Sequence, residues 1–465
     1  MSTLGGCTSA EVTFADMSTF SEMESFLYGG PYAVTQFVGA VTKGNWFSHV
    51  PITLRSQGTV DFGQRKVSYV LNRSADYICA VWFRTRIPFI TSTVGAVRWT
   101  RKLMHNMIDT CKIKFNELLV QEFDSYWLDF HQELRVTASK YVGYQNMIAD
   151  TTAFYGVSTS AGPTPGNTKG DGGFHSVVLP FWFGEDSGLA LPIAATPHNE
   201  VTIEFSFRRW QNLVVVSGGA TIASVAAAES NVAYTVATAP TPAQVGQVPV
   251  LTAQDIQFIE PELYAHYAMV HNDERLKMGD APRDILIKQV QTVQKVPISG
   301  QQVTQDLRLS HAIINIVWAY QNTTLLDANA DGGGEWSNYH CLQNYQNVAD
   351  PIAFSRLTYE NSQRFREGSD YFNLILPYLL TDVVPVASQG TGYIHLWSYS
   401  TRPWACLGGY GSTNFNKLAN VSLQHVHSPA AITALGAGET FRHAAYAQNH
   451  NVFRLANGSV GQPIL

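Results

Sequence analysis

Oxygen-bearing side chains alternate in one short stretch of the sequence, at Asp327, Asn329 and Asp331, and a glycine follows them. This pattern matches the first half of a calcium-binding loop, in which hard oxygen ligands at alternate positions wrap around a hard cation. The position that should carry a bidentate glutamate holds Asn338, and Glu335 could replace it only in part. We therefore expect an ordinary solvated turn here, with bound calcium as the weaker alternative.

Two histidines form an H-x-H pair at His425 and His427, a spacing that metal-binding cupin barrels use. A cupin also needs a nearby glutamate and a further histidine in a second motif, and the next glutamate, Glu439, is too distant for the first motif. Because the remaining ligands of a metal site are missing, the pair predicts a strand whose histidines face solvent or an interface.

The sequence contains no G-x-S-x-G nucleophile elbow, no P-loop and no H-E-x-x-H motif. The arginine pairs Arg84/Arg86 and Arg208/Arg209 favour exposed strand faces or subunit contacts over phosphate sites. We identify no catalytic residue, and we expect no cofactor and no enzymatic activity.

Four asparagines lie in N-x-S/T sequons, at Asn72, Asn322, Asn420 and Asn457. Residues 1–13 lack the basic and apolar regions of a secretory signal peptide. We therefore keep the four asparagines only as weak glycosylation candidates, since chance also produces such sequons.

The composition bounds the class of protein. The chain has 465 residues, with 30 Lys+Arg against 36 Asp+Glu and a net charge of −6, which disfavours a protein that coats nucleic acid. Only 14% of the residues are charged, against the usual ~25%, so the chain buries much of itself or sits against other protein. Five cysteines without a C-x-x-C pair indicate free thiols in a reducing compartment. The sequence contains no run of 18 apolar residues, so we predict no membrane-spanning helix.

Most of the chain shows the two-residue alternation of half-buried antiparallel strands. We expect three such strands. In Tyr77–Phe83 and Val201–Phe207 the odd-numbered residues share one face, and in Ile314–Tyr320 the even-numbered residues share one face. Helical spacing is limited to Phe14–Leu27, where Thr19 and Glu22 fit a capping box and the apolar stripe predicts core packing. The pattern indicates an all-β protein with long surface loops and short helices.

Long stretches of small and neutral residues interrupt the strands at Ser158–Gly173, Ser217–Val250 and Thr323–Gly334. Loops of this length are uncommon in compact domains, although a jelly roll tolerates insertions at the ends of its strands. The most charged local run, His271–Asp284, separates two strand-rich halves and predicts an interdomain linker.

One segment carries a specific resemblance. Leu179–Ile203 reads LPFWFGEDSGLALPIAATPHNEVTI, which is similar to the signature of the major capsid proteins of nucleocytoplasmic large DNA viruses, the iridovirus-like and algal-virus-like group. The matching positions are Leu179, Pro180, Phe181, Trp182, Phe183, Asp186, Ser187, Gly188, Leu189, Ala190, Leu191, Pro192, Asn199 and Glu200. Phe14–Gly30, Gly411–Leu423 and Asn449–Gly458 also resemble family segments, so the resemblance covers nearly the whole chain.

The resemblance implies two tandem eight-stranded antiparallel jelly rolls. We expect an N-terminal arm at 1–30, a first jelly roll at 31–271, a linker at 272–283 and a second jelly roll at 284–465. The family's function implies a homotrimeric, pseudo-hexameric capsomer that builds the outer shell of an icosahedral double-stranded DNA virus and assembles in the host cytoplasm.

The implied partners are the chain itself, neighbouring capsomers, and minor capsid, cement and penton proteins. The arm is expected to touch minor proteins or the internal membrane, and no direct contact with nucleic acid is expected. Two alternatives remain open: a minor or vertex capsid protein, which often has a single jelly roll, and a jelly-roll carbohydrate-binding or cupin-type protein.

Overall fold

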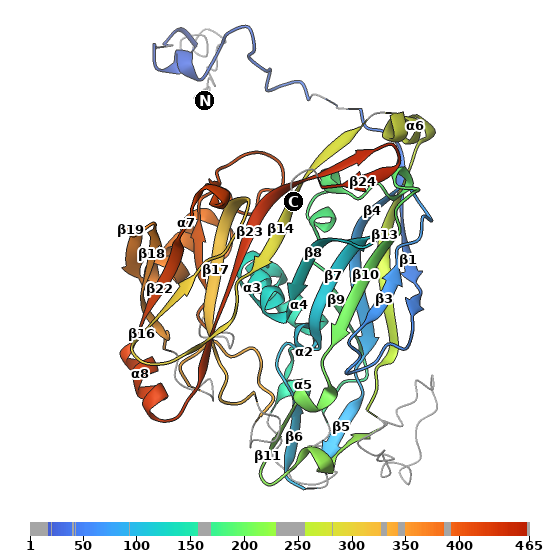
Figure 1. The fold of residues 1–465 in the computed structure, drawn as a ribbon. Coiled ribbons are helices and arrows are strands. Elements are labelled where there is room, and N and C mark those ends of the chain that lie inside the picture. The colour runs from blue at the N-terminus through green and yellow to red at the C-terminus, as the bar shows by residue number, and fades with distance from the viewer. Residues whose placement is uncertain are drawn as a thin grey trace, which may run out of the picture. The chain divides into compact units, whose positions relative to one another are not determined.

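The computed structural model describes residues 17–19, 21–39, 41, 43–92, 94–156, 169–228, 256–280, 282–326, 333–342, 349–385 and 392–462. The chain divides into two compact units, Met1–Trp46 and Phe47–Leu465. The larger unit consists of two β-sandwiches that lie side by side (Figure 1).

The first sandwich is made of two antiparallel sheets with shorter ribbons beyond one end. Its outer sheet has the order β1 (Phe47–Leu54), β13 (Ile259–Val270), β4 (Tyr77–Arg86) and β9 (Phe174–Val178). Its second sheet has the order β2 (Ser56–Gln57), β3 (Val67–Val70), β10 (Val201–Phe207), β7 (Ile108–Phe115) and β8 (Leu118–Asp124). The ribbons pair β11 (Val214–Ser217) with β6 (Ala96–Trp99), and β12 (Val225–Ala228) with β5 (Phe89–Ser92).

The second sandwich repeats this plan. One sheet has the order β14 (Arg283–Thr292), β23 (Phe441–Ala456), β17 (Ala312–Asn322) and β20 (His395–Ser398). The short strands β15 (Val296–Ile298), β21 (Thr413–Asn414) and β24 (Ser459–Gly461) join it at its margins. The facing sheet has the order β16 (Gln302–Asp306), β22 (Val421–His427), β18 (Ile352–Tyr359) and β19 (Ser362–Gly368).

The two sandwiches have the same topology. Without the two-residue strand β2, the marginal strands and the ribbons, the described strands of each half can be numbered one to eight in chain order, and both halves then form sheets 1-8-3-6 and 2-7-4-5. This is the connectivity of a jelly roll, with sheets that stay open at their edges. The predicted fold of two tandem antiparallel jelly rolls is therefore confirmed, and the duplication is visible in the topology although no sequence repeat shows it.

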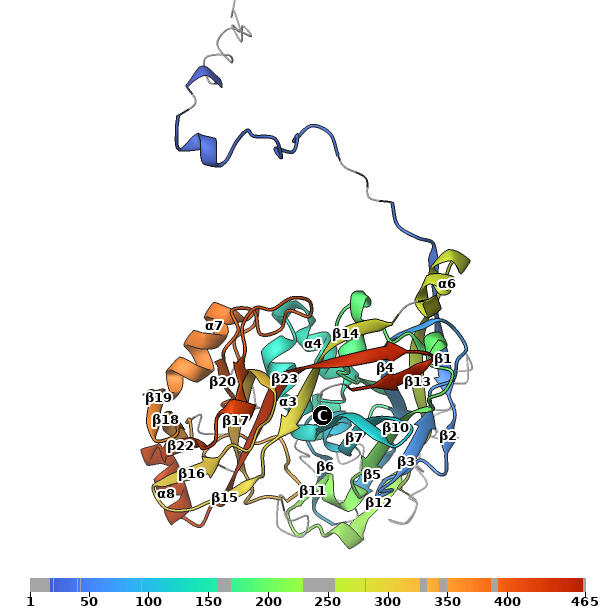
Figure 2. The ribbon, with the colours of Figure 1, turned by 45° about the horizontal axis from the view of Figure 1, so that its top comes forward.

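Short helices fill the connections (Figure 2). The α-helices are α2 (Leu103–Asn106), α3 (Ser125–Arg135), α4 (Ala138–Met147), α5 (Thr152–Tyr155), α6 (Asn272–Asp280), α7 (Leu376–Leu380) and α8 (Pro429–Gly436). The single-turn segments are η1 (Glu24–Phe26), η2 (Trp182–Gly184), η3 (Ser187–Leu189), η4 (Ile193–Ala195), η5 (Trp210–Asn212), η6 (Ile222–Ser224), η9 (Tyr371–Ile375) and η11 (Phe415–Lys417). Among the described residues, no helix is both long and apolar enough to cross a membrane.

The predicted strand alternation holds where one face is solvated. It fails in β17, which contains Ile314–Tyr320 and is buried on both faces, and it fails where the register shifts. Strand β10 alternates buried and half-buried residues throughout, as predicted. In β4 the prediction is wrong for Tyr77 and Cys79, which are half-buried, while Ile78 is buried with Val81 and Phe83. The pairing of β4 with β13 shifts register at this point, so one extra residue moves the earlier side chains to the other face.

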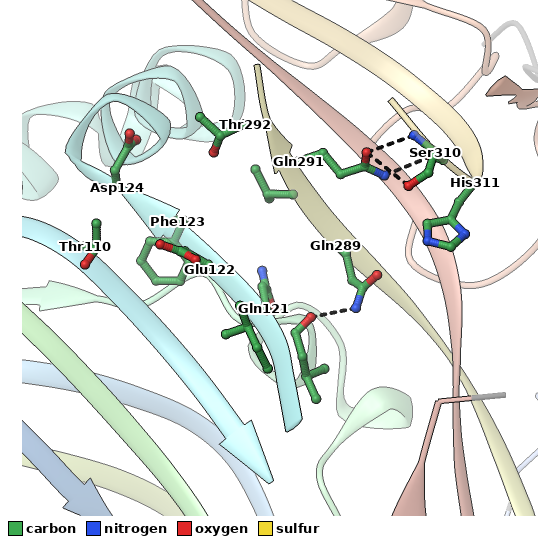
Figure 3. Close-up of a pocket in the computed structure, with 13 residues that line it drawn as sticks. Thr110, Gln121, Glu122, Phe123, Asp124, Gln289, Gln291, Thr292, Ser310 and His311 are labelled. Atoms are coloured by element: carbon green, nitrogen blue, oxygen red, sulfur yellow. Dashed lines mark hydrogen bonds between the residues drawn. The ribbon is translucent and has the colours of Figure 1, made fainter. Parts of the chain in front are cut away.

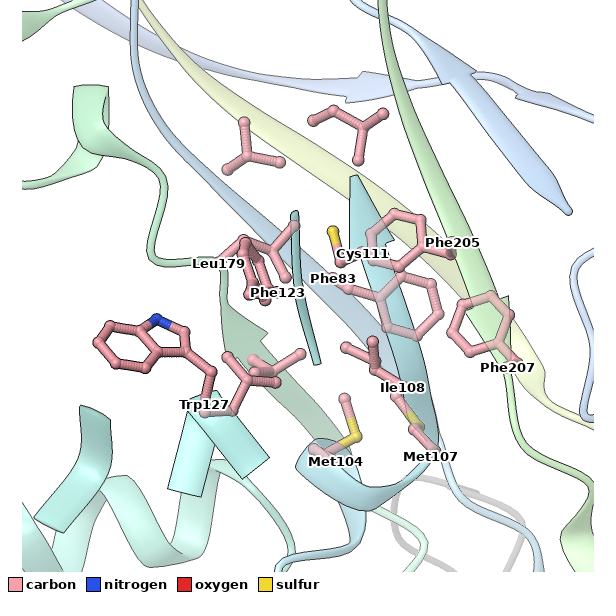
Figure 4. Close-up of a cluster of buried hydrophobic side chains, with 14 of the residues drawn as sticks. Phe83, Met104, Met107, Ile108, Cys111, Phe123, Trp127, Leu179, Phe205 and Phe207 are labelled. Atoms are coloured by element: carbon pink, nitrogen blue, oxygen red, sulfur yellow. The ribbon is translucent and has the colours of Figure 1, made fainter. Parts of the chain in front are cut away.

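The core of the first sandwich is aromatic. Phe83, Phe205 and Phe207 lie together with ring centroids 5.4–5.7 Å apart, and Cys111 faces them from β7 (Figure 4). All four are nearly inaccessible to solvent. Burial of side chains of this size supplies most of the free energy that holds the two sheets together.

The N-terminal unit corrects the predicted apolar helix. Its described residues include the 3-10 helix η1, and the backbone N–H of Ser21 donates to Glu24 Oε2 at 2.6 Å. Met17, Met23, Phe26 and Leu27 are between 74% and 89% exposed. The described residues of the stripe therefore do not form a core within the N-terminal unit.

The predicted domain bounds stay a prediction, and the strands lie as follows. Strand β1 starts at Phe47, sixteen residues beyond the predicted start at 31. The predicted linker contains α6 (Asn272–Asp280), and β14 then opens the second sandwich at Arg283. Arg275 of α6 binds Asp76 through two hydrogen bonds of 2.7 and 2.9 Å, which tie the helix to the first sandwich.

Candidate functional site

The two sandwiches join through α3, which follows β8 directly. Asp124 ends the strand and caps the helix, because its Oδ1 accepts from the backbone N–H of Trp127 at 3.1 Å. Trp127 and Phe130 then lie against the ring of Tyr446 in β23, with centroids 6.0 and 5.5 Å away. A helix of the first sandwich therefore packs on a sheet of the second.

Asp124 also anchors the junction through its charge. The hydroxyl of Tyr446 donates to both carboxylate oxygens at 2.7 and 2.6 Å, and Lys295 Nζ lies 2.7 Å from Oδ2. Burial, together with the adjacent Asp124 carboxylate, raises the pKa of Tyr446 far above its usual value, so the phenol keeps the proton that it donates. One carboxylate thus caps α3 and holds two residues of the second sandwich.

A second buried carboxylate, Asp129, connects three segments. Its Oδ1 lies 2.9 Å from His105 Nδ1, and its Oδ2 accepts from the hydroxyls of Ser337 at 2.7 Å and Tyr339 at 3.2 Å. Burial opposes the negative charge, but Lys102 and these donors outweigh it and lower the pKa of Asp129. Burial lowers the pKa of His105, so a neutral ring donates from Nδ1. The network is structural, since every group in it is committed to another protein group.

The signature segment is a buried wedge at the same junction. Phe181, Trp182 and Phe183 are at most 1% exposed. The Trp182 ring lies 5.6 Å from the ring of Phe453 in β23, and Phe181 lies 5.2 Å from Phe123 in β8. The aromatic triplet therefore links both sandwiches, and its role is packing.

The rest of the signature segment closes turns. Asp186 caps η3 by accepting from the backbone N–H of Gly188 at 2.7 Å, and Leu191 forms a backbone bridge to Ile78. Asn199 Oδ1 accepts from the N–H of Val460 at 3.0 Å, which ties the end of the chain to the first sandwich. The remaining members divide by exposure: Leu179, Leu189, Ala190 and Pro192 are buried, Pro180 is half-buried, and Ser187, Gly188 and Glu200 are exposed.

Among the described residues of the larger unit, two surfaces rich in exposed or half-buried apolar side chains stand out. The first is the outer face of sheet β1-β13-β4-β9, where Trp82 stacks on Tyr264 at 5.4 Å with their planes 5° apart. On the same face the guanidinium of Arg84 lies 3.7 Å above the centre of the Phe174 ring. Phe174 is 41% exposed, and Val178 at the edge is 43% exposed. We call these residues, with Arg86, the outer-sheet face.

The second uncovered surface lies on η9 and α7. Leu374, Ile375, Tyr378 and Leu379 are 50%, 44%, 75% and 64% exposed, and we call them the α7 patch. Sequence reasoning missed this patch, because helical spacing within ten residues does not distinguish a buried stripe from an exposed one.

The prediction that His425 and His427 face solvent or an interface is wrong. His425 and His427 are 0% and 2% exposed, because their side of β22 faces the core of the second sandwich. His425 Nε2 lies 3.1 Å from His443 Nε2, and His425 Nδ1 lies 2.9 Å from Ser355 Oγ. Burial and the facing histidines lower the pKa values of His425 and His443, the latter to about 3. Two ring nitrogens at this distance share one proton, so the pair is neutral.

One arginine prediction also needs correction. Arg208 is buried, and it donates to Asn106 O at 2.7 Å and Ser125 Oγ at 2.9 Å. Its guanidinium lies 3.9 Å above the ring of Trp336. The residue is therefore part of the junction, whereas the neighbouring Arg209 is exposed.

The calcium-loop residues Asp327, Asn329 and Asp331 lie outside the described residues. Glu335, which follows them, is buried and pairs with Arg98, and Asn338 is buried as well. Within the described ranges, no group of three or more His, Cys, Asp or Glu side chains could hold a metal ion. The calcium site stays a prediction.

The sequons differ in exposure. Asn72, Asn420 and Asn457 are exposed. Asn322 is 2% exposed, and its amide donates to Cys341 O at 3.4 Å and to Glu439. A glycan on Asn322 would have to displace this packing, whereas the other three asparagines stay candidates.

A cavity of about 600 Å³ lies between β8 and β14 (Figure 3). Gln289 Nε2 donates to Val120 O at 2.6 Å, and Gln291 Oε1 accepts from the N–H of Ser310 at 3.0 Å. Because these amides are satisfied by the protein itself, the cavity is a polar seam between the two sandwiches.

Two family models match this chain. "Major capsid protein N-terminus" matches residues 35–245, and "Large eukaryotic DNA virus major capsid protein" matches residues 274–461. The major capsid protein of Costelytra zealandica iridescent virus is 39% identical over 97% of this chain and 98% of its own length. The major capsid protein of Frog virus 3 is 29% identical over 97% of both chains.

Solved structures share the fold. A capsid protein chain in the quasi-atomic model of the PBCV-1 capsid gives a TM-score of 0.68 at 18% identity, covering 93% of this chain and 100% of that one. The Faustovirus major capsid protein gives 0.70 at 10% identity, covering 91% and 93%. The matches extend over both sandwiches.

Proposed function

This chain belongs to the major capsid proteins of large eukaryotic DNA viruses, and from that premise we propose that three copies join into one pseudo-hexagonal capsomer. It is a structural protein of the virion capsid, and its chemistry lies in packing and association. The observation that carries the trimer is the repeated strand order, since two equivalent sandwiches per chain give three chains six equivalent units. A ring of this kind needs heterologous contacts, in which each copy offers two different surfaces.

Strand ends give each capsomer an orientation. The ribbons and the described parts of the long insertions lie beyond one end of the first sandwich, next to the pairing of Arg86 with Ile259. Strand β1 begins at the opposite end, where Phe47 pairs with Val270 next to α6. We assign the insertion end to the outside of the particle, where small neutral loops tolerate exposure, and the β1 end to the inside.

The N-terminal unit is assigned an inner partner. Phe26, Tyr32, Phe37 and Trp46 are between 85% and 98% exposed, so the described residues of their own unit do not cover these side chains. Exposed apolar side chains gathered in one segment mark an interaction site. The partner is a minor capsid protein or the internal membrane, and assembly takes place in the host cytoplasm. Neighbouring capsomers and cement and penton proteins contact the sandwich walls, and nucleic acid is not bound directly.

The test is the mass of the purified chain in solution, by light scattering coupled to size exclusion. The proposal predicts a species of three times 51.3 kDa with hexagonal outlines in electron micrographs. A species of 51.3 kDa at all concentrations would contradict it. Removal of residues 1–46 should leave the trimer intact and impair shell assembly, and loss of the trimer itself would contradict the assigned inner role.

A further inference from the structure

We propose that the α7 patch of one copy packs on the outer-sheet face of the next copy, and that this contact forms each seam of the capsomer. The inference rests on the proposed trimer and adds which surfaces meet in it. It follows from a contact that the chain already makes with itself.

The internal contact joins equivalent parts of the two jelly rolls. Helix α3 lies in the connection between the fifth and sixth strands of the first sandwich, β8 and β9. It covers the outer side of the 1-8-3-6 sheet of the second sandwich. The side chains of that sheet that join the core of the first sandwich are Ile285, Ile287, Val317, Ala319, Leu396, Ala444, Tyr446, Phe453 and Leu455.

In the second sandwich, η9 and α7 occupy the same connection, between β19 and β20. Their inner side closes the sandwich, since Phe372 lies 5.2 Å from Trp318 and 5.0 Å from Phe365 between ring centroids. The opposite side carries the α7 patch. On α3 the corresponding side is buried, with Trp127 and Phe130 at 1% and 0% exposure. The α7 patch is thus the equivalent of the α3 surface, but the described residues place no sheet against it.

The sheet face that would receive the α7 patch is also left open by the described residues. The outer-sheet face belongs to the 1-8-3-6 sheet of the first sandwich, the topological equivalent of the sheet that α3 covers. Trp82 and Tyr264 are half-buried and lie on the middle strands β4 and β13. Tyr446 lies on β23, which is the equivalent eighth strand of the sheet that α3 covers. Aromatic side chains in this position offer the large, flat contact area typical of interface centres.

The charges of the two surfaces favour their contact, because the outer-sheet face carries two arginines against one carboxylate, Glu262, which accepts from the Tyr264 hydroxyl at 2.7 Å. Arg84 and Arg86 lie over the Phe174 ring, and neither pairs with a carboxylate among the described residues. Asp370 occupies the residue position just before η9, makes no side-chain capping hydrogen bond and is exposed, and Asp382 follows α7. In the internal contact, Asp124 stands at the equivalent position before α3, and its carboxylate lies 2.7 Å from Lys295 Nζ of the opposite sandwich. An acidic residue at the start of the helical connection is therefore common to both sandwiches, and the proposed seam would place Arg84 and Arg86 of the next copy near it.

A second copy of this chain is the occupant that fits. Helix α7 and the sheet that carries the outer-sheet face lie on different sandwiches, on opposite sides of the larger unit, so one chain cannot bring the two surfaces together (Figure 1). A contact between one copy's α7 patch and another copy's outer-sheet face leaves one free surface of each kind. Repetition closes a ring in which internal and intersubunit contacts alternate.

Two variants, compared with a matched control, test the seam. Leu379→Asp places a charge in the α7 patch, and the same change at Leu276, which is 71% exposed on α6, is the control. We expect Leu379→Asp to weaken trimer formation by at least about tenfold, because a charge is then desolvated at the centre of the contact. Leu276→Asp should form trimers like the parent chain. Circular dichroism confirms folding, and Tyr378→Ser provides a milder change in the same patch.

A mixing experiment separates this seam from other arrangements. Trp82→Asp disables the outer-sheet face and leaves the α7 patch intact, whereas Leu379→Asp does the reverse. An equimolar mixture of the two variants should form a one-to-one pair that cannot grow, with twice the mass of one chain. Trimers from either variant alone, or no pair on mixing, would overturn the seam while leaving the capsomer proposal in place. A monomeric parent chain would overturn both.

Discussion

The two 1-8-3-6 sheets have the same strand order, but they differ in what packs against their outer faces. Sheet β14-β23-β17-β20 is covered on both faces, and every residue of β17 after Ala312 is buried. Sheet β1-β13-β4-β9 is covered on one face, and its outer side carries Trp82, Arg84 and Tyr264, which are half-buried. The difference shows that cover by a neighbour, and not topology, determines which side chains an equivalent sheet carries.

The strongest test of this comparison exchanges one tyrosine on each sheet for alanine. Tyr446→Ala should lower the free energy of unfolding by about 3–5 kcal/mol, because it leaves a cavity in the junction and a buried Asp124 without its donor. Tyr264→Ala should cost less than about 1 kcal/mol in the isolated chain, because water already reaches its site. Urea unfolding of both variants under monomeric conditions measures the two values. Equal costs would show that the outer-sheet face carries as much of the fold as the junction.

The cores of the two sandwiches differ as well. Phenylalanines meet between the sheets of the first, whereas His425 and His443 meet in the second beside Trp318 and Tyr320. At pH 5 an unfolded histidine, with a pKa of about 6.5, binds a proton that buried His443, with a pKa of about 3, does not.

Unfolding therefore takes up a proton as the pH falls below 6.5, and stability decreases from there toward the folded pKa. We expect a loss of about 2 kcal/mol for His443 alone between pH 7 and pH 5. Urea unfolding at the two pH values measures it, and His443→Gln should flatten the dependence. His271→Gln, which removes a 57% exposed side chain, is the matched control. An unchanged pH dependence in His443→Gln would contradict the assignment.

The smallest effect on stability is expected at the solvent-exposed end of sheet β14-β23-β17-β20. Arg454 binds Asp284 through two hydrogen bonds of 2.7 Å, and both side chains are about half exposed. Exposed ion pairs contribute little, because water competes for both charges. Arg454→Ala should leave the melting temperature of the chain unchanged in a thermal scan. A clear decrease would mean that a neighbour covers this end also.

The sequence predicted the fold class where one face of a strand is solvated, as in β10. It predicted the wrong face for Tyr77 and Cys79, because a register shift in one strand is decided by its partner β13. It placed His425 and His427 at a surface, although polar side chains that pair with one another can fill a core. The resemblance identified the signature segment, but the wedge formed by Trp182 against Phe453 joins residues 271 positions apart, which no local pattern reveals.

The functional surfaces were the least predictable. Leu374, Ile375, Tyr378 and Leu379 have the composition of a core stripe, and only the position of α7 on its sandwich shows that the described residues leave them exposed. Asp129 is an ordinary helical acid in the sequence, and its role depends on Ser337 and Tyr339, more than 200 residues away.

The most direct test of the central claim is a cryo-electron microscopy map of the purified oligomer, at a resolution that separates helices from strands. The account predicts three chains in a ring, with α7 of each copy against β4 and β13 of the next. A map in which α7 faces solvent, or in which the outer-sheet face is bare, would contradict it.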